Sequence, residues 1–354
     1  MDRKNGFTLL RLVSAFLVLV THSYVMLRAG PDPLAKATHL LAFSTLGVDT
    51  FFVVSGFLIC GSLLRNPSPW IYLRNRSLRI MPALVAVVLV STFAIGPLIT
   101  NAPDYWHNRV TYLYLYTATA YGYHEFLPGV FTGNPVHVVN GSLWTLPIEI
   151  TCYLMLLTVS WCRALHWRSM VALIAALMAL HIGDAFPRLH FLFQMELLQV
   201  NRFAILFLGG ALLATLSPRL PFRLSWAGGA VVLIAAAVLP GQRDWHYFAA
   251  VYLLLWPYVI VTLAFSLKRV DWLNKYDVSY GFYLYGFLIQ QCCVLLFGQG
   301  HGFGIRTLTL LASAIDLVCA VLSWFLIEKP ALALKRRRHQ ARPQGGAALE
   351  AAGE

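Results

Sequence analysis

The sequence predicts an all-α polytopic membrane protein with about ten transmembrane helices and both termini in the cytoplasm. Hydrophobic residues make up 58% of the 354 residues and charged residues only 12%, and the mean hydropathy is +0.66. Soluble proteins contain about 25% charged residues, so this composition leaves too little polar surface to cover a water-soluble particle. It excludes a disordered protein and a soluble α/β enzyme.

The apolar segments are long enough to cross a bilayer. A span needs about 20 apolar residues to cross about 30 Å of hydrocarbon. The weaker candidates are 168–183 and 224–240, which are short, and 278–298, which carries several tyrosines and two glutamines. The ten expected spans are 7–27, 39–63, 79–100, 142–161, 168–183, 198–216, 224–240, 246–267, 278–298 and 305–327.

The basic residues predict the orientation of these spans. With the N-terminus inside, about 19 of the 27 Lys and Arg residues fall in inner segments and about 7 in outer segments, while Arg11 lies in the first span. Cytoplasmic loops are enriched in Lys and Arg. Both termini are therefore expected in the cytoplasm, and the net charge of +12 indicates membrane topology rather than a nucleic-acid partner.

The chain is expected to form one transmembrane domain, 1–334, followed by a basic and then disordered cytoplasmic tail, 335–354. The long outer loop 101–141 is rich in Tyr, Trp and His. Such aromatic side chains either anchor the protein at the membrane interface or stack on sugar rings, and the sequence leaves both open. The six cysteines form no C-x-x-C pair, and no metal site is expected.

The first span contains two polar residues on one face. Arg11 and His22 are eleven residues apart, which places them within about 20° on a helix and about 16 Å apart along its axis. Intramembrane charges are costly and usually face a partner or a reaction, and histidine is the side chain best suited to accept a proton near neutral pH. The alternative is a snorkelling Arg11 and a hydrogen-bonded core His22.

Two carboxylates also fall within apolar segments. Glu149 lies in the outer half of the fourth span and needs a partner, for which His22 or Arg11 is the obvious kind. Asp49 belongs either to a polar cluster or to the exposed end of the second span. The neighbouring Ser55-Gly56 pair is typical of close helix packing.

An inner loop carries Arg74, Arg76 and Arg79. Arg76 and Arg79 are three residues apart, so on a continuing helix they share a face and can bind a polyanion. The alternative is that an inner loop is basic simply because of the membrane orientation.

Six motifs occur along the chain in order. They are Arg11 and His22 with ten residues between them, Gly47-Val48-Asp49 with Phe51–Phe57, Arg76-Ser77-Leu78-Arg79-Ile80 with Pro82, Ser142–Glu149, Tyr280–Tyr285 and Phe325–Pro330. With these motifs the sequence resembles the acyltransferase 3 family, bacterial integral membrane proteins that transfer acyl groups, commonly acetyl, to sugars of polysaccharides and related acceptors. At Gly286 the family often has histidine, and the C-terminal hydrolase-like domain of some relatives is not expected here.

The resemblance implies transfer of an acyl group, commonly acetyl, from cytoplasmic acyl-CoA to a hydroxyl of a saccharide or glycoconjugate, with acetyl-CoA as the expected donor. Acyl-CoA is then a co-substrate, with no permanently bound cofactor, and the location is the bacterial cytoplasmic (inner) membrane. His22 is expected to act as general base, helped by Arg11 and Glu149. The donor is expected to bind Arg74, Arg76 and Arg79, and the expected supporting polar cluster is Asp49, Ser55, Ser142, Trp144 and Tyr283.

The sequence leaves two other classes of function open. Intramembrane charges also suit a proton-coupled transporter or an exporter of a glycan or lipid precursor, although no repeated halves are evident. A non-catalytic member of a glycan-export complex would tolerate loss of His22. Besides the bilayer, the donor and the acceptor, a second copy of the chain or glycan-assembly proteins are conceivable partners.

Overall fold

The computed structural model describes residues 5–183, 190–191, 195–238, 245–298 and 303–340. These residues form a helical molecule with one antiparallel pair of two-residue strands. The helices and strands are α1 (Phe7–Met26), α2 (Pro33–Thr38), α3 (Phe43–Arg65), α4 (Pro69–Val90), α5 (Gly96–Ile99), α6 (Arg109–Tyr114), α7 (Leu146–Trp161), α8 (Trp167–Ile182), β1 (His190–Phe191), β2 (Met195–Glu196), α9 (Leu197–Leu216), α10 (Leu224–Val238), α11 (Trp245–Ser266), α12 (Ser279–Phe297), α13 (Ile305–Ser323) and α14 (Lys329–Gln340).

Helices occupy all ten segments that the sequence predicts as spans. Within the described residues, eight helical segments are long and apolar enough to cross a membrane. The two shorter apolar helices are α8, with 16 residues, and α10, with 15 residues. The helical, multi-pass fold class is therefore confirmed, while the count of ten spans and the cytoplasmic position of both termini stay predictions.

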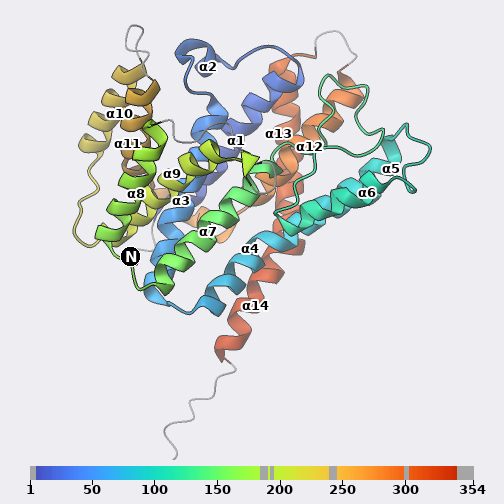
Figure 1. The fold of residues 1–354 in the computed structure, drawn as a ribbon. Coiled ribbons are helices and arrows are strands. Elements are labelled where there is room, and N and C mark those ends of the chain that lie inside the picture. Colours follow the sequence, from blue (N-terminus) through green and yellow to red (C-terminus); the bar gives the residue numbers. More distant parts are fainter. Residues whose placement is uncertain (1–4, 184–189, 192–194, 239–244, 299–302, 341–354) are drawn as a thin grey trace, which may run out of the picture.

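Helix α3 lies at the centre of the bundle. It packs against α1 and α9, with α8, α10 and α11 on one side and α12 and α13 on the other (Figure 1). Glycines allow this close approach. A Cβ atom at Gly56 would lie 1.9 Å from the carbonyl oxygen of Phe207, and one at Gly210 would lie 2.1 Å from that of Val53. The packing role expected for Gly56 is confirmed, because only a hydrogen atom fits between the two backbones.

Segment 101–141 is tied to the helices by amide side chains. Nδ2 of Asn134 donates to Oε1 of Gln291 at 2.8 Å, and Nε2 of Gln291 donates to the carbonyl oxygens of Val136 and Val138. Nδ2 of Asn140 donates to the carbonyl oxygen of Leu284 at 2.8 Å. Gln291, Asn134 and Asn140 thus hold the loop against α12, because these amides pair with buried carbonyl groups that would otherwise be unpaired.

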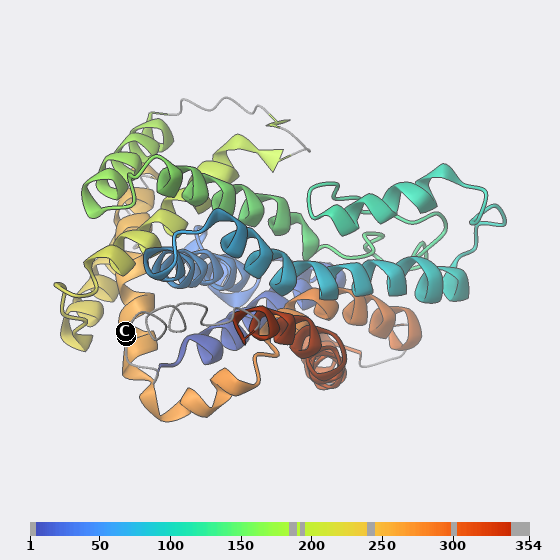
Figure 2. The same cartoon turned by 90° about the horizontal axis from the view of Figure 1, so that it is seen from below.

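Helices α4 and α14 pack together at one end of the bundle (Figure 2). Ser68 caps α4 by accepting a hydrogen bond from the backbone of Ile71, and Pro69 follows at the first helical position, where its missing N–H costs nothing. A π-helical turn, Trp324–Glu328, leads from α13 into α14. Helix α14 runs across the predicted domain limit at residue 334, and residues 341–354 of the predicted tail lie outside the described residues.

Candidate functional site

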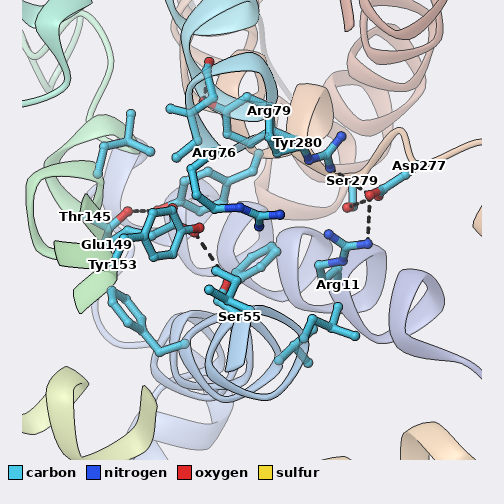
Figure 3. A pocket seen from close by; sticks show the side chains of 18 of the residues that line it. Arg11, Ser55, Arg76, Arg79, Thr145, Glu149, Tyr153, Asp277, Ser279 and Tyr280 are labelled. Carbon is cyan, nitrogen blue, oxygen red and sulfur yellow. Dashed lines mark hydrogen bonds and ion pairs between the residues drawn. The ribbon is translucent and has the colours of Figure 1, made fainter. Parts of the chain in front are cut away.

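A cavity of about 350 Å³ opens beside the first half of α1, where α3, α4, α7, α12 and α14 converge. Its lining includes three arginines, Arg11, Arg76 and Arg79, and we call it the arginine cavity (Figure 3). Two of the three expected donor-binding arginines therefore share one cavity with the arginine of the first span. Arg74 is not part of the lining.

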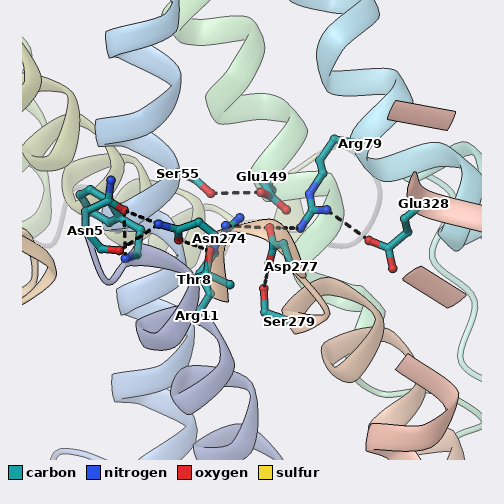
Figure 4. Close-up of polar contacts among 11 residues, drawn as sticks. Asn5, Thr8, Arg11, Ser55, Arg79, Glu149, Asn274, Asp277, Ser279 and Glu328 are labelled. Carbon is teal, nitrogen blue, oxygen red and sulfur yellow. Dashed lines mark hydrogen bonds and ion pairs between the residues drawn. The ribbon is translucent and has the colours of Figure 1, made fainter. Parts of the chain in front are cut away.

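Two carboxylates hold two of these arginines. Oδ2 of Asp277 lies 2.7 Å from Nη2 of Arg11 and 2.7 Å from Nη2 of Arg79. Nη1 of Arg79 also contacts Oε2 of the buried Glu328 at 3.2 Å. The result is a row of alternating charges that joins α1, α4, the connection before α12 and the π-helical turn before α14 (Figure 4).

Asp277 lies in the short connection before α12, outside the membrane-spanning helix. Burial alone would raise the pKa of its carboxyl group, but the Arg11 and Arg79 guanidinium groups, together with the Ser279 hydroxyl that donates to Oδ1 at 2.6 Å, hold this pKa below its usual value. Asp277 is therefore ionised at neutral pH and holds Arg11 and Arg79 at one point.

Arg76 differs from these two arginines. Its guanidinium group points into the arginine cavity (Figure 3), and within the described residues it forms no ion pair within 4 Å. The cavity thus contains a permanent cation whose charge no neighbouring carboxylate neutralises by contact.

Glu149 also lines the arginine cavity, but its partners are hydroxyl groups. Oε1 accepts a hydrogen bond from Ser55 at 3.3 Å and a second, short one from Tyr153. The expectation that Glu149 pairs with His22 or Arg11 is wrong. Tyr153 lies one helical turn further along α7, so its hydroxyl group is close enough to donate a hydrogen bond to the Glu149 carboxylate.

His22 lies in a different place from the arginines. It lines a hollow of about 160 Å³ together with Thr45, Trp144, Gln199 and Arg202, which we call the histidine hollow. Its half-buried ring packs edge-to-face against Phe287, with 5.0 Å between ring centroids. The imidazole therefore faces a space lined by protein, and no hydrogen bond fixes either ring nitrogen within the described residues.

Asp49 supports the wall of the histidine hollow. It is fully buried and pairs with Arg202 through a short contact, while the Tyr252 hydroxyl donates to the same oxygen at 2.7 Å. Arg202 also stacks on Phe203, at 5.1 Å from the ring centroid. Of the expected polar cluster, Ser55 lies in the arginine cavity and Trp144 in the histidine hollow, whereas Ser142 is buried and lines neither.

The two cavities meet at two residues. Val48 and Tyr283 line both the arginine cavity and the histidine hollow. The Tyr283 hydroxyl is 2.8 Å from Oγ1 of Thr145, and its ring packs edge-to-face against Phe51. Tyr283, the one predicted site residue common to both spaces, thus forms the boundary between them.

The glycine at position 286 faces a carboxyl group. A Cβ atom there would lie 2.9 Å from Oδ2 of Asp316, a fully buried residue of α13. Within the described residues neither carboxyl oxygen of Asp316 has a hydrogen-bond partner. Because Gly286 has no side chain, the carboxyl group of Asp316 fits against α12 at this position.

Comparison with known proteins identifies the relatives of this chain. Residues 4–328 match the acyltransferase 3 family model, described as an acyltransferase domain. The chain belongs to the acyltransferase 3 family. The resemblance inferred from its motifs is confirmed, and the protein is a multi-pass membrane acyltransferase by family. No solved structure matches the chain.

Two curated relatives match over most of the acyltransferase 3 chain. One is named O-acetyl transferase, from Shigella phage Sf6, and is 27% identical over 340 residues, which cover 93% of this chain and 96% of the relative. The other is named Nodulation protein 10, from Rhizobium leguminosarum bv. viciae, and is 32% identical over 358 residues, which cover 94% of each chain.

The acidic partners of these arginines are not among the site residues predicted from the sequence. Asp277 precedes the Tyr280–Tyr285 motif, and Glu328 lies within the Phe325–Pro330 motif, yet neither received a role. A signal was present, because a carboxylate at the end of an expected span needs a partner just as an intramembrane arginine does. Tyr153, at four residues from Glu149, offered a similar local signal.

Proposed function

We propose that this protein is a membrane O-acyltransferase that moves an acyl group, with acetyl as the expected one, from cytoplasmic acyl-CoA to a hydroxyl of a saccharide or glycoconjugate. The observation that carries this proposal is the junction of two chemically different cavities at Val48 and Tyr283. One cavity is lined by four cations and two carboxylates, and the other contains the imidazole of His22 with one cation, Arg202. The family is one of acyltransferases, and one relative is named as an O-acetyl transferase.

The arginine cavity suits the donor. Coenzyme A carries several phosphate charges, which guanidinium groups bind well. In this proposal the phosphates stay beside the cations, and the thioester end reaches past Tyr283 toward His22. Glu149, held by Ser55 and Tyr153, lies on this route and would accept hydrogen bonds from the amide groups of the pantetheine arm.

The histidine hollow suits the acceptor. It adjoins a second hollow of about 210 Å³, with which it shares Thr45, Gln199 and Arg202 and which extends to Trp245. Aromatic faces combined with amide and hydroxyl groups are suited to a sugar, whose rings have apolar faces and polar edges. The acceptor hydroxyl would thus approach His22 from the side opposite the donor.

The transfer step then needs one base. His22 takes the proton of the acceptor hydroxyl as that oxygen attacks the thioester carbonyl, forming the new C–O bond. The C–S bond breaks, and the imidazolium returns the proton to the leaving thiolate, so that the products are the ester and free coenzyme A. Arg11 stays with Asp277 in the arginine cavity, and its contribution is electrostatic support of the donor.

Purified protein tests this proposal most simply. In detergent micelles without any gradient, the protein should convert acetyl-CoA to coenzyme A thiol when supplied with glycan extracts of its host, and the glycans should gain one acyl unit by mass spectrometry. Turnover that requires no gradient distinguishes the enzyme from a transporter. Glycans of identical mass from cells with and without the protein would contradict the proposal.

A further inference from the structure

The charges in the arginine cavity do not balance. Asp277 contacts Arg11 and Arg79, and Glu328 contacts Arg79, whereas within the described residues Arg76 forms no ion pair. The other carboxylate of the cavity, Glu149, is hydrogen-bonded to Ser55 and Tyr153, and the four cations of the lining still outnumber these three carboxylates. We propose that Lys335 of α14 joins Arg76 to form the binding site for the phosphate groups of the donor. This inference rests on the proposed function and assigns a donor-binding role to a residue outside the motifs that characterise the sequence.

The geometry of α14 brings Lys335 to the cavity. Leu332 and Lys335 are three residues apart, share one face of the helix, and both line the arginine cavity. Helix α14 packs against α4, the helix that carries Arg76 and Arg79 (Figure 2). The position of Lys335 thus follows from a helix that continues past residue 334, where the sequence alone predicts the start of a tail.

Lys335 lies in a positive environment. The side chains whose charges act most strongly on it are Arg76, Arg79 and Arg74, and all of them are cations. Within the described residues Lys335 forms no ion pair within 4 Å. Because like charges that converge in a partly buried place repel one another, this arrangement favours the binding of an anion.

Arg76 and Lys335 complement each other as phosphate ligands. The Arg76 guanidinium can bind two phosphate oxygens side by side, whereas the Lys335 ammonium is a compact charge on a flexible stem. Arg79 differs because Asp277 and Glu328 already occupy both terminal nitrogens of its guanidinium group. We therefore assign the phosphate contacts to Arg76 and Lys335, and to Arg79 the positioning of Asp277 and of α4.

Ligand titration of the purified full-length protein in detergent tests this assignment without knowledge of the acceptor. Lys335→Gln should raise the Kd for coenzyme A about tenfold, the loss of about 1.4 kcal/mol expected for a charged contact. The same variant should bind pantetheine, which has no phosphate, within about twofold of the wild type. Lys335→Arg, which keeps the charge, should restore most of the affinity for coenzyme A.

Lys329→Gln is the matched control. Lys329 belongs to the same helix, but its ammonium lies 5.0 Å from the centroid of the Phe325 ring and it does not line the cavity. This variant should bind coenzyme A like the wild type. Equal losses for Lys335→Gln and Lys329→Gln would reduce the effect to general surface charge and overturn the assignment.

Three other results would also overturn it. Unchanged binding of coenzyme A by Lys335→Gln would do so while leaving the proposed function intact. So would an equal loss of pantetheine and coenzyme A, because the variant would then have disturbed the whole cavity. If the wild type bound anionic phospholipid at this site but not coenzyme A, both the inference and the acyl-CoA donor of the proposed function would fail.

Discussion

The two ends of α1 lie in chemically different surroundings. Arg11, near its start, belongs to a cavity with three arginines, a lysine and two carboxylates, whereas His22, near its end, lies among aromatic, amide and hydroxyl groups with one cation, Arg202. In the proposed function, the charged cavity binds the phosphates of the donor, and the cavity with aromatic and neutral polar groups binds the sugar acceptor. One helix thus borders both cavities, and the chemical difference between them is the basis on which the proposal assigns a substrate to each.

Replacement of His22 should produce the largest change. His22→Ala should lower kcat about 10³-fold, within the range expected for loss of a general base, while the Kd for coenzyme A stays unchanged, because the arginine cavity is intact. Steady-state kinetics and titration of the same preparation measure the two quantities. His107→Ala, at an exposed histidine of segment 101–141, is the control. A weaker donor affinity in His22→Ala would mean that the two ends are not independent.

Loss of the Asp277 carboxylate should destabilise the arginine cavity at the start of α1. Asp277→Asn leaves Arg11 and Arg79 facing each other without their shared carboxylate, and removal of one partner from a buried ion pair costs about 3 kcal/mol. Thermal unfolding in detergent should show this loss of stability, and donor binding should weaken as well. Asp271→Asn alters a nearby aspartate that has no ion pair within the described residues and should change neither.

The difference in stability between the wild type and Asp277→Asn should depend on pH. The arginines lower the pKa of Asp277 in the folded protein, so its contribution to stability is fully present above the ordinary value of about 3.9. This contribution is lost only as the pH falls through the lowered pKa. The stability difference between wild type and Asp277→Asn should stay constant from about pH 5 to 8 and narrow below about pH 4. A difference that shrinks near neutral pH would contradict the charged network.

Substitution of Tyr283, at the boundary between the two cavities, should have a smaller effect than the substitutions above. Tyr283→Phe removes the hydrogen bond with Thr145, and Tyr280→Phe removes one with the carbonyl oxygen of Ile80. Each should cost about 1 kcal/mol of stability. Of these two tyrosines, Tyr283 lines both cavities and Tyr280 lines the arginine cavity alone, so of the two substitutions only Tyr283→Phe should lower kcat, by several-fold, with donor affinity preserved. Equal effects of the two substitutions on kcat would contradict the role of Tyr283 at the boundary between the two cavities.

Much of the fold follows from local patterns in the sequence. Every predicted span coincides with a helix because apolar length alone specifies a membrane helix, and the segments 168–183 and 224–240, expected to be short, are the short helices α8 and α10. The shared face of Arg11 and His22 stays a prediction from helical geometry, and the structure places the two side chains in different cavities.

The pairing within the site does not follow from local patterns. Arg11 and Asp277 are 266 residues apart in the sequence, and Asp49 and Arg202 are 153 residues apart. Their contacts depend on which helices pack together, and for α3 and α9 that depends on small residues such as Gly56 and Gly210. Glu149 illustrates the limit, since its need for a partner was foreseeable but the choice of Ser55 and Tyr153 over His22 was not.

The most direct measurement is the structure of the wild-type protein with a non-reactive thioether analogue of acetyl-CoA. The account predicts that the phosphates lie beside Arg76 and Lys335, that the chain passes Tyr283, and that the sulfur lies within reach of the imidazole of His22. An analogue bound with its sulfur in the arginine cavity and its adenine in the histidine hollow, or bound outside both spaces, would contradict it.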